Sequence, residues 1–169
     1  MNGLFSASKN EVICSLHAPV NGKAIPESEI PDEVFSAGML GEGIGIVPSD
    51  GRFVSPVKGT VVDITPTLHA YSLLSDDGAE ILLHIGIDTV ELKGKGFEKL
   101  VNVGDRIDVG TPLANVDLDL ITQEGYSTTT ALIIINSDGL SQVTTFIGDS
   151  SAGKTEIFKC VIKKASSKY

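Results

Sequence analysis

Two histidines, His69 and His84, lie fifteen positions apart on either side of the turn signal Asp77-Gly78. An Asp-Gly pair between strand-forming segments is typical of a β-hairpin. If the turn is centred between residues 76 and 77, the two histidines are directly opposed, with Cβ atoms about 5 Å apart. If it is centred on Asp77-Gly78, they are diagonal neighbours on one face, because side chains alternate along a strand. Only a slip by an odd number of residues would separate them.

Two imidazoles on one face of a sheet suggest proton, phosphoryl or metal chemistry. A neutral imidazole, with an unperturbed pKa of about 6.5, keeps a lone pair on one ring nitrogen near neutral pH. That nitrogen can accept a phosphoryl group and form a covalent intermediate. A backbone carbonyl that accepts a hydrogen bond from Nδ1 of His84 would leave Nε2 as the nucleophile, and Gly86 could let such a carbonyl come close.

The elements that must position these histidines read as short strands. Strand-like runs recur every eight to twelve residues, separated by turn signals such as Asn21-Gly22 and Asp138-Gly139. The runs are Val12–Leu16, Gly43–Val47, Thr60–Ile64, Ala70–Leu74, Glu80–Ile85, Arg106–Val109, Pro112–Asp117, Thr130–Ile135, Gln142–Phe146 and Glu156–Ile162. We therefore predict an all-β fold, an antiparallel sandwich or barrel. Short helical turns are expected around Asp32–Phe35 and Leu118–Glu124.

Composition and length indicate a globular chain with one domain. Of its 169 residues, 41% are hydrophobic and 21% are charged, which is enough for a sizeable core. We expect this domain to span residues 11–163, with a flexible N-terminus over residues 1–10 and a frayed C-terminus over residues 164–169.

Charge and apolar patterning limit the partners and the location. The net charge of −9 argues against binding to nucleic acid or to an anionic membrane surface, and fits a basic protein partner. No apolar run reaches the ~18 residues of a membrane span, so no membrane insertion is expected. The N-terminus lacks the features of a secretion signal. Cys14 and Cys160 read as two buried thiols rather than a disulfide. These features together favour the cytoplasm.

Two conspicuous features are expected to have no catalytic role. Residues 148–155 fit the phosphate-loop pattern GxxxxGK[ST], but such a loop must open a helix. The segment that follows, Glu156–Ile162, favours a strand, so we predict a β-hairpin turn. His17 has no neighbouring partner in the sequence and is expected to be structural.

Seven further segments follow one another in a fixed order along the chain: Gly41–Pro48, Ser55–Val61, Thr67–Ala70, His84–Phe97, Val103–Ile107, Gly110–Leu113 and Val116-Asp117. Their order and the histidine spacing together resemble the glucose-family IIA domain of the bacterial phosphoenolpyruvate-dependent sugar phosphotransferase system. The resemblance runs over roughly residues 11–163, nearly the whole chain. The family fold, an antiparallel β-sandwich or barrel, agrees with the strand pattern.

The resemblance implies a phosphoryl relay in sugar uptake. His84 would accept the phosphoryl group on Nε2 from a phosphohistidine carrier protein (HPr), and pass it to the IIB domain of a sugar permease. His69 would assist the transfer, and Thr67 would orient His69. The implied docking surface has two acids and a rim of five apolar residues. These residues are Asp32, Asp88, Val34, Phe35, Met39, Leu40 and Val90. One departure is Thr65, where the family commonly has an aromatic residue.

Two other functions stay open at this point. A zinc hydrolase of similar β-architecture could use His69 and His84 as ligands, although a catalytic zinc usually has three protein ligands. A regulatory module could dock to metabolic enzymes or permeases according to the state of the histidine. No cofactor is expected for the relay, and zinc at the two histidines would be adventitious or regulatory.

Overall fold

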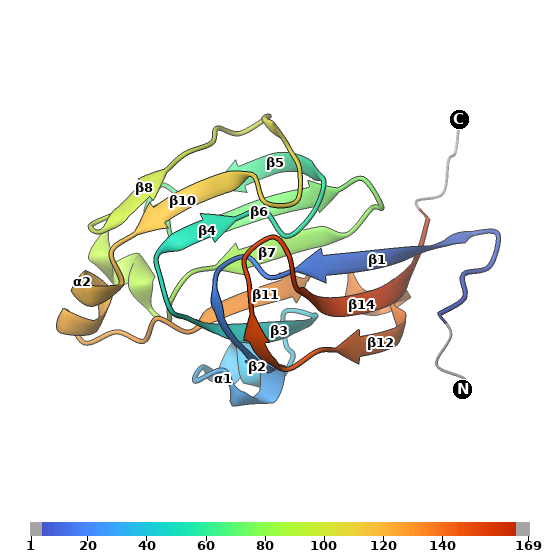
Figure 1. Cartoon of the computed structure of the whole chain (residues 1–169), viewed down its shortest axis with the longest axis horizontal. Coiled ribbons are helices and arrows are strands. Elements are labelled where there is room, and N and C mark those ends of the chain that lie inside the picture. Colours follow the sequence, from blue (N-terminus) through green and yellow to red (C-terminus); the bar gives the residue numbers. More distant parts are fainter. Residues whose placement is uncertain (1–4, 165–169) are drawn as a thin grey trace.

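The computed structural model describes residues 5–164, and these residues form mainly antiparallel β-structure (Figure 1). The strands are β1 (Glu11–His17), β2 (Gly22–Pro26), β3 (Glu42–Pro48), β4 (Arg52–Val54), β5 (Gly59–Ile64), β6 (Ala70–Ser75), β7 (Glu80–His84), β8 (Phe97–Lys99), β9 (Arg106–Ile107), β10 (Pro112–Val116), β11 (Thr130–Ile134), β12 (Ser141–Thr145), β13 (Gly148–Ser150) and β14 (Glu156–Lys163). The helices are α1 (Glu33–Ser36) and α2 (Leu118–Gln123), with 3-10 turns η1 (Glu27–Glu29), η2 (Thr89–Leu92) and η3 (Ser137–Gly139). The predicted all-β class and both helical turns are confirmed.

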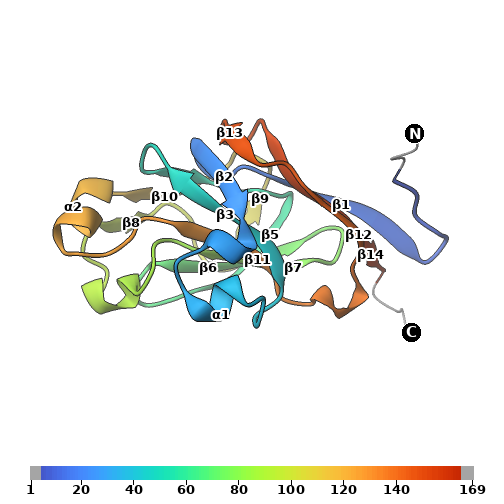
Figure 2. The ribbon, with the colours of Figure 1, turned by 90° about the horizontal axis from the view of Figure 1, so that it is seen from below.

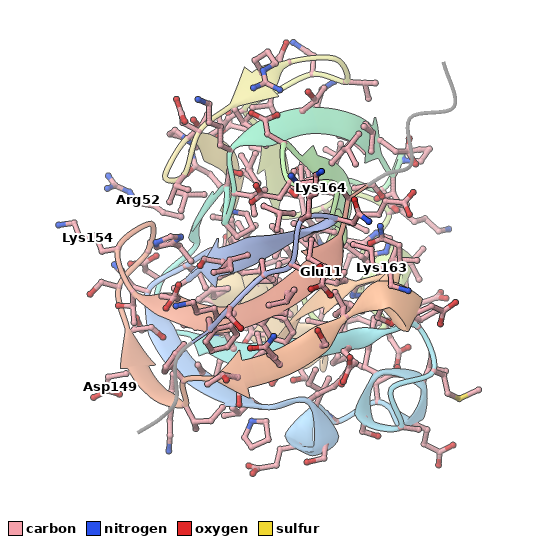
Figure 3. All side chains as sticks on the ribbon, turned by 90° about the vertical axis from the view of Figure 1, so that its right-hand side faces the viewer. Glu11, Arg52, Asp149, Lys154, Lys163 and Lys164 are labelled. Atoms are coloured by element: carbon pink, nitrogen blue, oxygen red, sulfur yellow. The ribbon has the colours of Figure 1, made fainter. Side chains whose placement is uncertain are left out.

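The strands form one large sheet and two small ones. The large sheet has eight strands in the order β13-β2-β3-β11-β7-β6-β5-β9, and the small sheets have the orders β1-β14-β12 and β4-β10-β8. Strand β1 is paired with β14, so the first and last strands lie side by side (Figure 1). We call β1-β14-β12 the terminal sheet. Figure 3 views it from its own side and shows Glu11, Lys163 and Lys164 gathered at one end.

The sequence did not predict β2, β4, β8 and β13 as strands. Three of them, β4, β8 and β13, have only three residues each, too few for a period-two pattern to stand out. The predicted turn at Asn21-Gly22 leads directly into β2, which begins at Gly22. Predictions about residues 1–4 and 165–169 fall outside the described residues.

The large sheet is buried on both faces around its central strands. On the inner face, Tyr71 and Leu73 of β6 and Ile81 and Leu83 of β7 join the main aliphatic core. On the outer face a small second cluster lies beneath α1, which is seen from below in Figure 2. Its members are Ile30, Phe35, Ile87, Ala131 and Ile133. All five residues of β11 are therefore buried, which explains the continuous apolar run that follows Thr130.

The register of the β6–β7 hairpin differs from both predicted registers. His84 is opposed to Ala70, not to His69, and the intermediate pair Leu73–Ile81 follows the same register. The turn has three residues, 76–78, because Ser75 N donates to Ala79 O and Gly78 takes a left-handed φ of 95°. Such three-residue loops are a common hairpin type. The slip is thus by one residue, the odd kind that should separate two strand residues on opposite faces.

Residues 148–155, which fit the phosphate-loop pattern, open no helix, as expected. They do not form the predicted hairpin turn either. β13 pairs with β2 in the large sheet, whereas β14 pairs with β1 and β12 in the terminal sheet. The segment between them therefore connects two sheets. The predicted pair of thiols is confirmed: Cys14 and Cys160 are free and buried, and they are directly opposed across β1 and β14.

Candidate functional site

His84 is the last residue of β7 and lies on the outer face of the large sheet. Its two cross-strand neighbours are both alanines, Ala70 on β6 and Ala131 on β11. Such small neighbours leave the imidazole room to stand on the sheet, where Phe35 of α1 packs against it with ring centroids 5.1 Å apart. The strand pairing and α1 together restrict the ring from three sides.

A backbone carbonyl determines which nitrogen of His84 is free. Nδ1 lies 2.8 Å from the carbonyl oxygen of Gly86. Because a carbonyl can only accept, Nδ1 carries the proton, and in the neutral ring Nε2 keeps its lone pair. Gly86 has a φ of 78°, and a Cβ there would lie 2.4 Å from Cγ2 of Thr89. This tight turn therefore requires glycine.

His69 reaches the same face from a loop, not from a strand. It is the last residue of the four-residue loop between Thr65 and Ala70. The residue before it, Leu68, has a left-handed backbone, with a φ of 61°. The His69 carbonyl accepts from the Ile85 amide at 2.8 Å. The His69 and His84 rings meet edge to face, with centroids 4.8 Å apart and planes at 82°. Because His69 lies in this loop and not in the pleated strand, its ring reaches His84 although the strand register alone would separate them.

Hydroxyl groups hold the other end of the His69 ring. Oγ1 of Thr67 lies 2.8 Å from Nδ1 of His69, and Oγ1 of Thr65 lies 3.4 Å from the same nitrogen. A hydroxyl can donate or accept, so the Thr67 contact taken alone suits either protonation state of the ring. Sequence reasoning named Thr67 but did not predict the Thr65 contact.

Burial favours the neutral form of both histidines. Burial lowers the pKa of His69 to about 4, with a further lowering from the nearby His84. Burial also lowers the pKa of His84, although the Gly86 carbonyl and the charges of Asp32 and Asp88 oppose this shift. Two neutral imidazoles in contact can supply a nucleophilic nitrogen and a hydrogen-bond donor at one point.

The predicted apolar docking residues differ in exposure. Val34, Met39, Leu40 and Val90 are exposed, whereas Phe35 is only 6% exposed and contacts His84. The position of Phe35 is thus one of support beneath the predicted rim.

The two predicted acids also differ in their surroundings. Asp32 caps α1, with one side-chain oxygen accepting from the amides of Val34 and Phe35. Asp88 is exposed, takes a left-handed φ of 60° and makes no side-chain cap bond to η2. Asp32 therefore has a structural role beside any role in docking, whereas Asp88 has none that the described contacts reveal.

The segments that build the site are uniformly acidic. Residues 24–51 and 59–92 contain twelve Asp and Glu and neither Lys nor Arg. Such a distribution produces a negative field that would attract a basic partner. Within residues 5–164, no group of three or more His, Cys, Asp or Glu is arranged to hold a metal ion. No helix of the described chain is both long and apolar enough to cross a membrane.

Comparisons with known proteins found a matching family profile, a similar sequence and a similar structure. The profile of the phosphoenolpyruvate-dependent sugar phosphotransferase system, EIIA 1, matches residues 14–140. The PTS system glucose-specific EIICBA component of Staphylococcus saprophyticus is 52% identical over 122 residues, which cover 72% of this chain and 18% of that protein. The chain thus spans about a fifth of the length of this curated relative.

A solved structure shares the fold. Glucose permease IIA from Mycoplasma capricolum superposes with a TM-score of 0.82 at 34% identity, covering 88% of this chain and 96% of that one. Together with the profile match over most of the chain, this similarity confirms the family resemblance. The chain belongs to the EIIA 1 family of the phosphoenolpyruvate-dependent sugar phosphotransferase system.

Proposed function

We propose that this chain relays phosphoryl groups in sugar uptake, with Nε2 of His84 as the acceptor. The observation that supports this most strongly is the contact between Nδ1 of His84 and the Gly86 carbonyl, which leaves a lone pair on Nε2. In the first step the N–P bond of a phosphohistidine carrier protein (HPr) breaks and an N–P bond to His84 forms. In the second step that bond breaks and the phosphoryl group passes to the IIB domain of a sugar permease.

His69 would assist both steps from its position beside His84. With Nδ1 accepting from the Thr67 hydroxyl, Nε2–H of His69 is free to donate to the phosphoryl oxygens. Phosphoryl transfer depends mainly on positioning and on stabilising charge on these oxygens. Phe35 limits the access of water to the acceptor ring, while Thr67 orients the assisting ring.

The docking surface would combine the exposed apolar rim with the acidic field. Val34, Met39, Leu40 and Val90 are exposed, and Asp32 and Asp88 are close enough to affect the charge of His84. A basic carrier would be steered toward this face. We further propose the cytoplasm as the place of action, since two free buried thiols suit a reducing compartment.

The test is incubation with phosphoenolpyruvate, the first enzyme of the system and its histidine carrier, followed by intact mass. We expect the addition of one phosphoryl group, labile in acid and stable in base. A chelator tests the zinc hydrolase alternative: acceptance should persist or improve, because zinc and the phosphoryl group compete for Nε2. Loss of acceptance on chelation, with circular dichroism unchanged, would instead favour a catalytic zinc.

A regulatory docking role is compatible with the relay. The same surface could bind metabolic enzymes or permeases in one state of His84 only. Pull-downs with the phosphorylated and unphosphorylated protein would separate a relay alone from a relay that also regulates.

A further inference from the structure

Thr65 closes the loop that carries Thr67 and His69. Its amide donates to the Ala70 carbonyl at 3.0 Å, and its own carbonyl accepts from the Leu68 amide at 2.8 Å. Its hydroxyl accepts from the Ala70 amide at 3.1 Å. Ala70 is only 6% exposed, so this hydroxyl supplies a partner for an amide with little access to water.

The hydroxyl of Thr65 can also act as a donor. Because the oxygen already accepts from Ala70, its proton has two acceptors within reach, the Ala70 carbonyl and Nδ1 of His69, each at 3.4 Å. When Nδ1 of His69 is unprotonated, the proton can be shared with it. When that nitrogen is protonated, only the carbonyl remains. Thr65 therefore favours the neutral ring with its proton on Nε2, which is the nitrogen that can face a phosphoryl group.

We propose that Thr65 is a positioning residue for His69: its hydroxyl fixes the loop around the left-handed Leu68 and favours the His69 form that carries its proton on Nε2. The effect on transfer rests on the proposed function, whereas the effect on the ring does not. An aromatic side chain at this position, common in the family, lacks the hydroxyl on Cβ that makes these contacts.

The experiment compares Thr65→Val, which keeps the shape but removes the hydroxyl, with Thr65→Ser, which retains it. Thr111→Val is the matched control, because the Thr111 hydroxyl also accepts a loop amide, that of Asp108 at 2.9 Å, far along the chain from the histidines. Nitrogen-15 NMR of the histidine rings reports the tautomer and the titration of His69 in the unphosphorylated protein. Onward transfer from phosphorylated protein to a IIB domain is measured on the same variants.

We expect wild type, Thr65→Ser and Thr111→Val to hold His69 with its proton on Nε2. Thr65→Val should mix the two tautomers and slow onward transfer by about three- to tenfold, the effect of one hydrogen bond. If Thr65→Val does not fold, Thr65→Ala removes the same hydroxyl without bulk.

Three results would overturn the inference. They are a wild-type His69 with its proton on Nδ1, a hydroxyl-free variant with wild-type ring shifts or transfer, and a Thr65→Ser variant as defective as Thr65→Val. The proposed function fails separately, if the carrier does not phosphorylate wild type. The NMR comparison then still decides the role of Thr65.

Discussion

The two histidines of the site are held by different kinds of partner. His84 ends a strand and donates from Nδ1 to a backbone carbonyl, whereas His69 sits in a loop and meets two side-chain hydroxyls. A carbonyl accepts only, so it fixes one tautomer, while a hydroxyl can reverse its role. From this comparison we expect different roles for the two rings. His84 would keep the same nucleophilic nitrogen throughout, whereas His69 would change protonation as transfer proceeds.

Removal of the nucleophile should have the largest effect. His84→Gln should abolish phosphorylation by the carrier, because the amide offers no nitrogen lone pair comparable to that of a neutral imidazole. Intact mass measures this directly. His17→Gln is the control, since it changes the remaining histidine, on β1 in the terminal sheet, and should leave labelling intact. Persistent labelling of His84→Gln would assign the acceptor elsewhere.

Removal of the assisting ring should leave acceptance but impair onward transfer. The His69→Gln amide can donate one hydrogen bond, yet it cannot change protonation. We expect onward transfer to fall by about a hundredfold, at the lower end of what proton-transfer groups contribute. Rapid-quench assays of the phosphorylated protein with a IIB domain measure the rate. Equal rates in the variant and wild type would remove the proposed asymmetry between the rings.

Displacement of the Gly86 carbonyl should make His84 more like His69, because its tautomer would no longer be fixed. In Gly86→Ala the new Cβ would lie against Thr89, and the φ of 78° would be unfavourable by roughly 1–2 kcal/mol. The Gly86 carbonyl should therefore shift, and acceptance by His84 should slow by about tenfold or more, as small misplacements do. Nitrogen-15 NMR should show a mixture of His84 tautomers. Thermal unfolding separates this effect from a loss of fold, with Gly78→Ala as a turn-glycine control at open space.

Removal of the Asp88 charge should change the pKa of one ring and not of the other. Asp88 raises the pKa of His84, and no such effect of Asp88 acts on His69. Asp88→Asn, which tolerates the left-handed backbone, should lower the pKa of His84 and leave that of His69 unchanged. NMR titration tests this. Asp88 is a cleaner choice than Asp32, whose loss would also remove the cap of α1.

The same variant should affect docking by a few-fold. If the acidic face steers the carrier, Asp88→Asn should slow association, and the wild-type rate should fall as salt rises, because the Debye length is about 8 Å at physiological ionic strength. Stopped-flow kinetics at several salt concentrations measure both. Asp149→Asn on β13, at the far edge of the large sheet, is the control. A salt-insensitive wild-type rate would leave the acids without a steering role.

The smallest expected effect is on stability against pH. The folded pKa of His69 is about 4 against an ordinary 6.5, so between these values the unfolded chain binds a proton that the folded chain does not. The contribution of His69 to the free energy of unfolding should therefore be at its maximum above the ordinary pKa and should fall as the pH drops toward about 4. Urea unfolding at a series of pH values should show a shallower fall in His69→Gln. An identical slope in both proteins would mean that His69 titrates normally in the fold.

Local sequence was sufficient for the fold class, and it narrowed the chemistry to proton, phosphoryl or metal chemistry at two imidazoles. Alternating strand runs and frequent turn signals predicted antiparallel sheets, and α1 and α2 lie where short helical turns were expected. The pairing of two histidines across a hairpin pointed to one site. The contact of Nδ1 of His84 with a carbonyl near Gly86 was also predictable, because only two residues separate the ring from that carbonyl.

The tertiary structure alone determined how the two rings meet. The turn at residues 76–78 has three residues rather than two, which gives a register that should part His69 from His84. They meet because Leu68 is left-handed, the Thr65–Ala70 contacts close the loop at the start of β6, and the His69 carbonyl accepts from the Ile85 amide just after β7. A period-two pattern reveals none of these contacts. The burial of Phe35 on His84, and the opposition of Cys14 and Cys160 across a separation of most of the chain, likewise depend on long-range packing. Such contacts join residues with no local signal, so only the folded chain places them together.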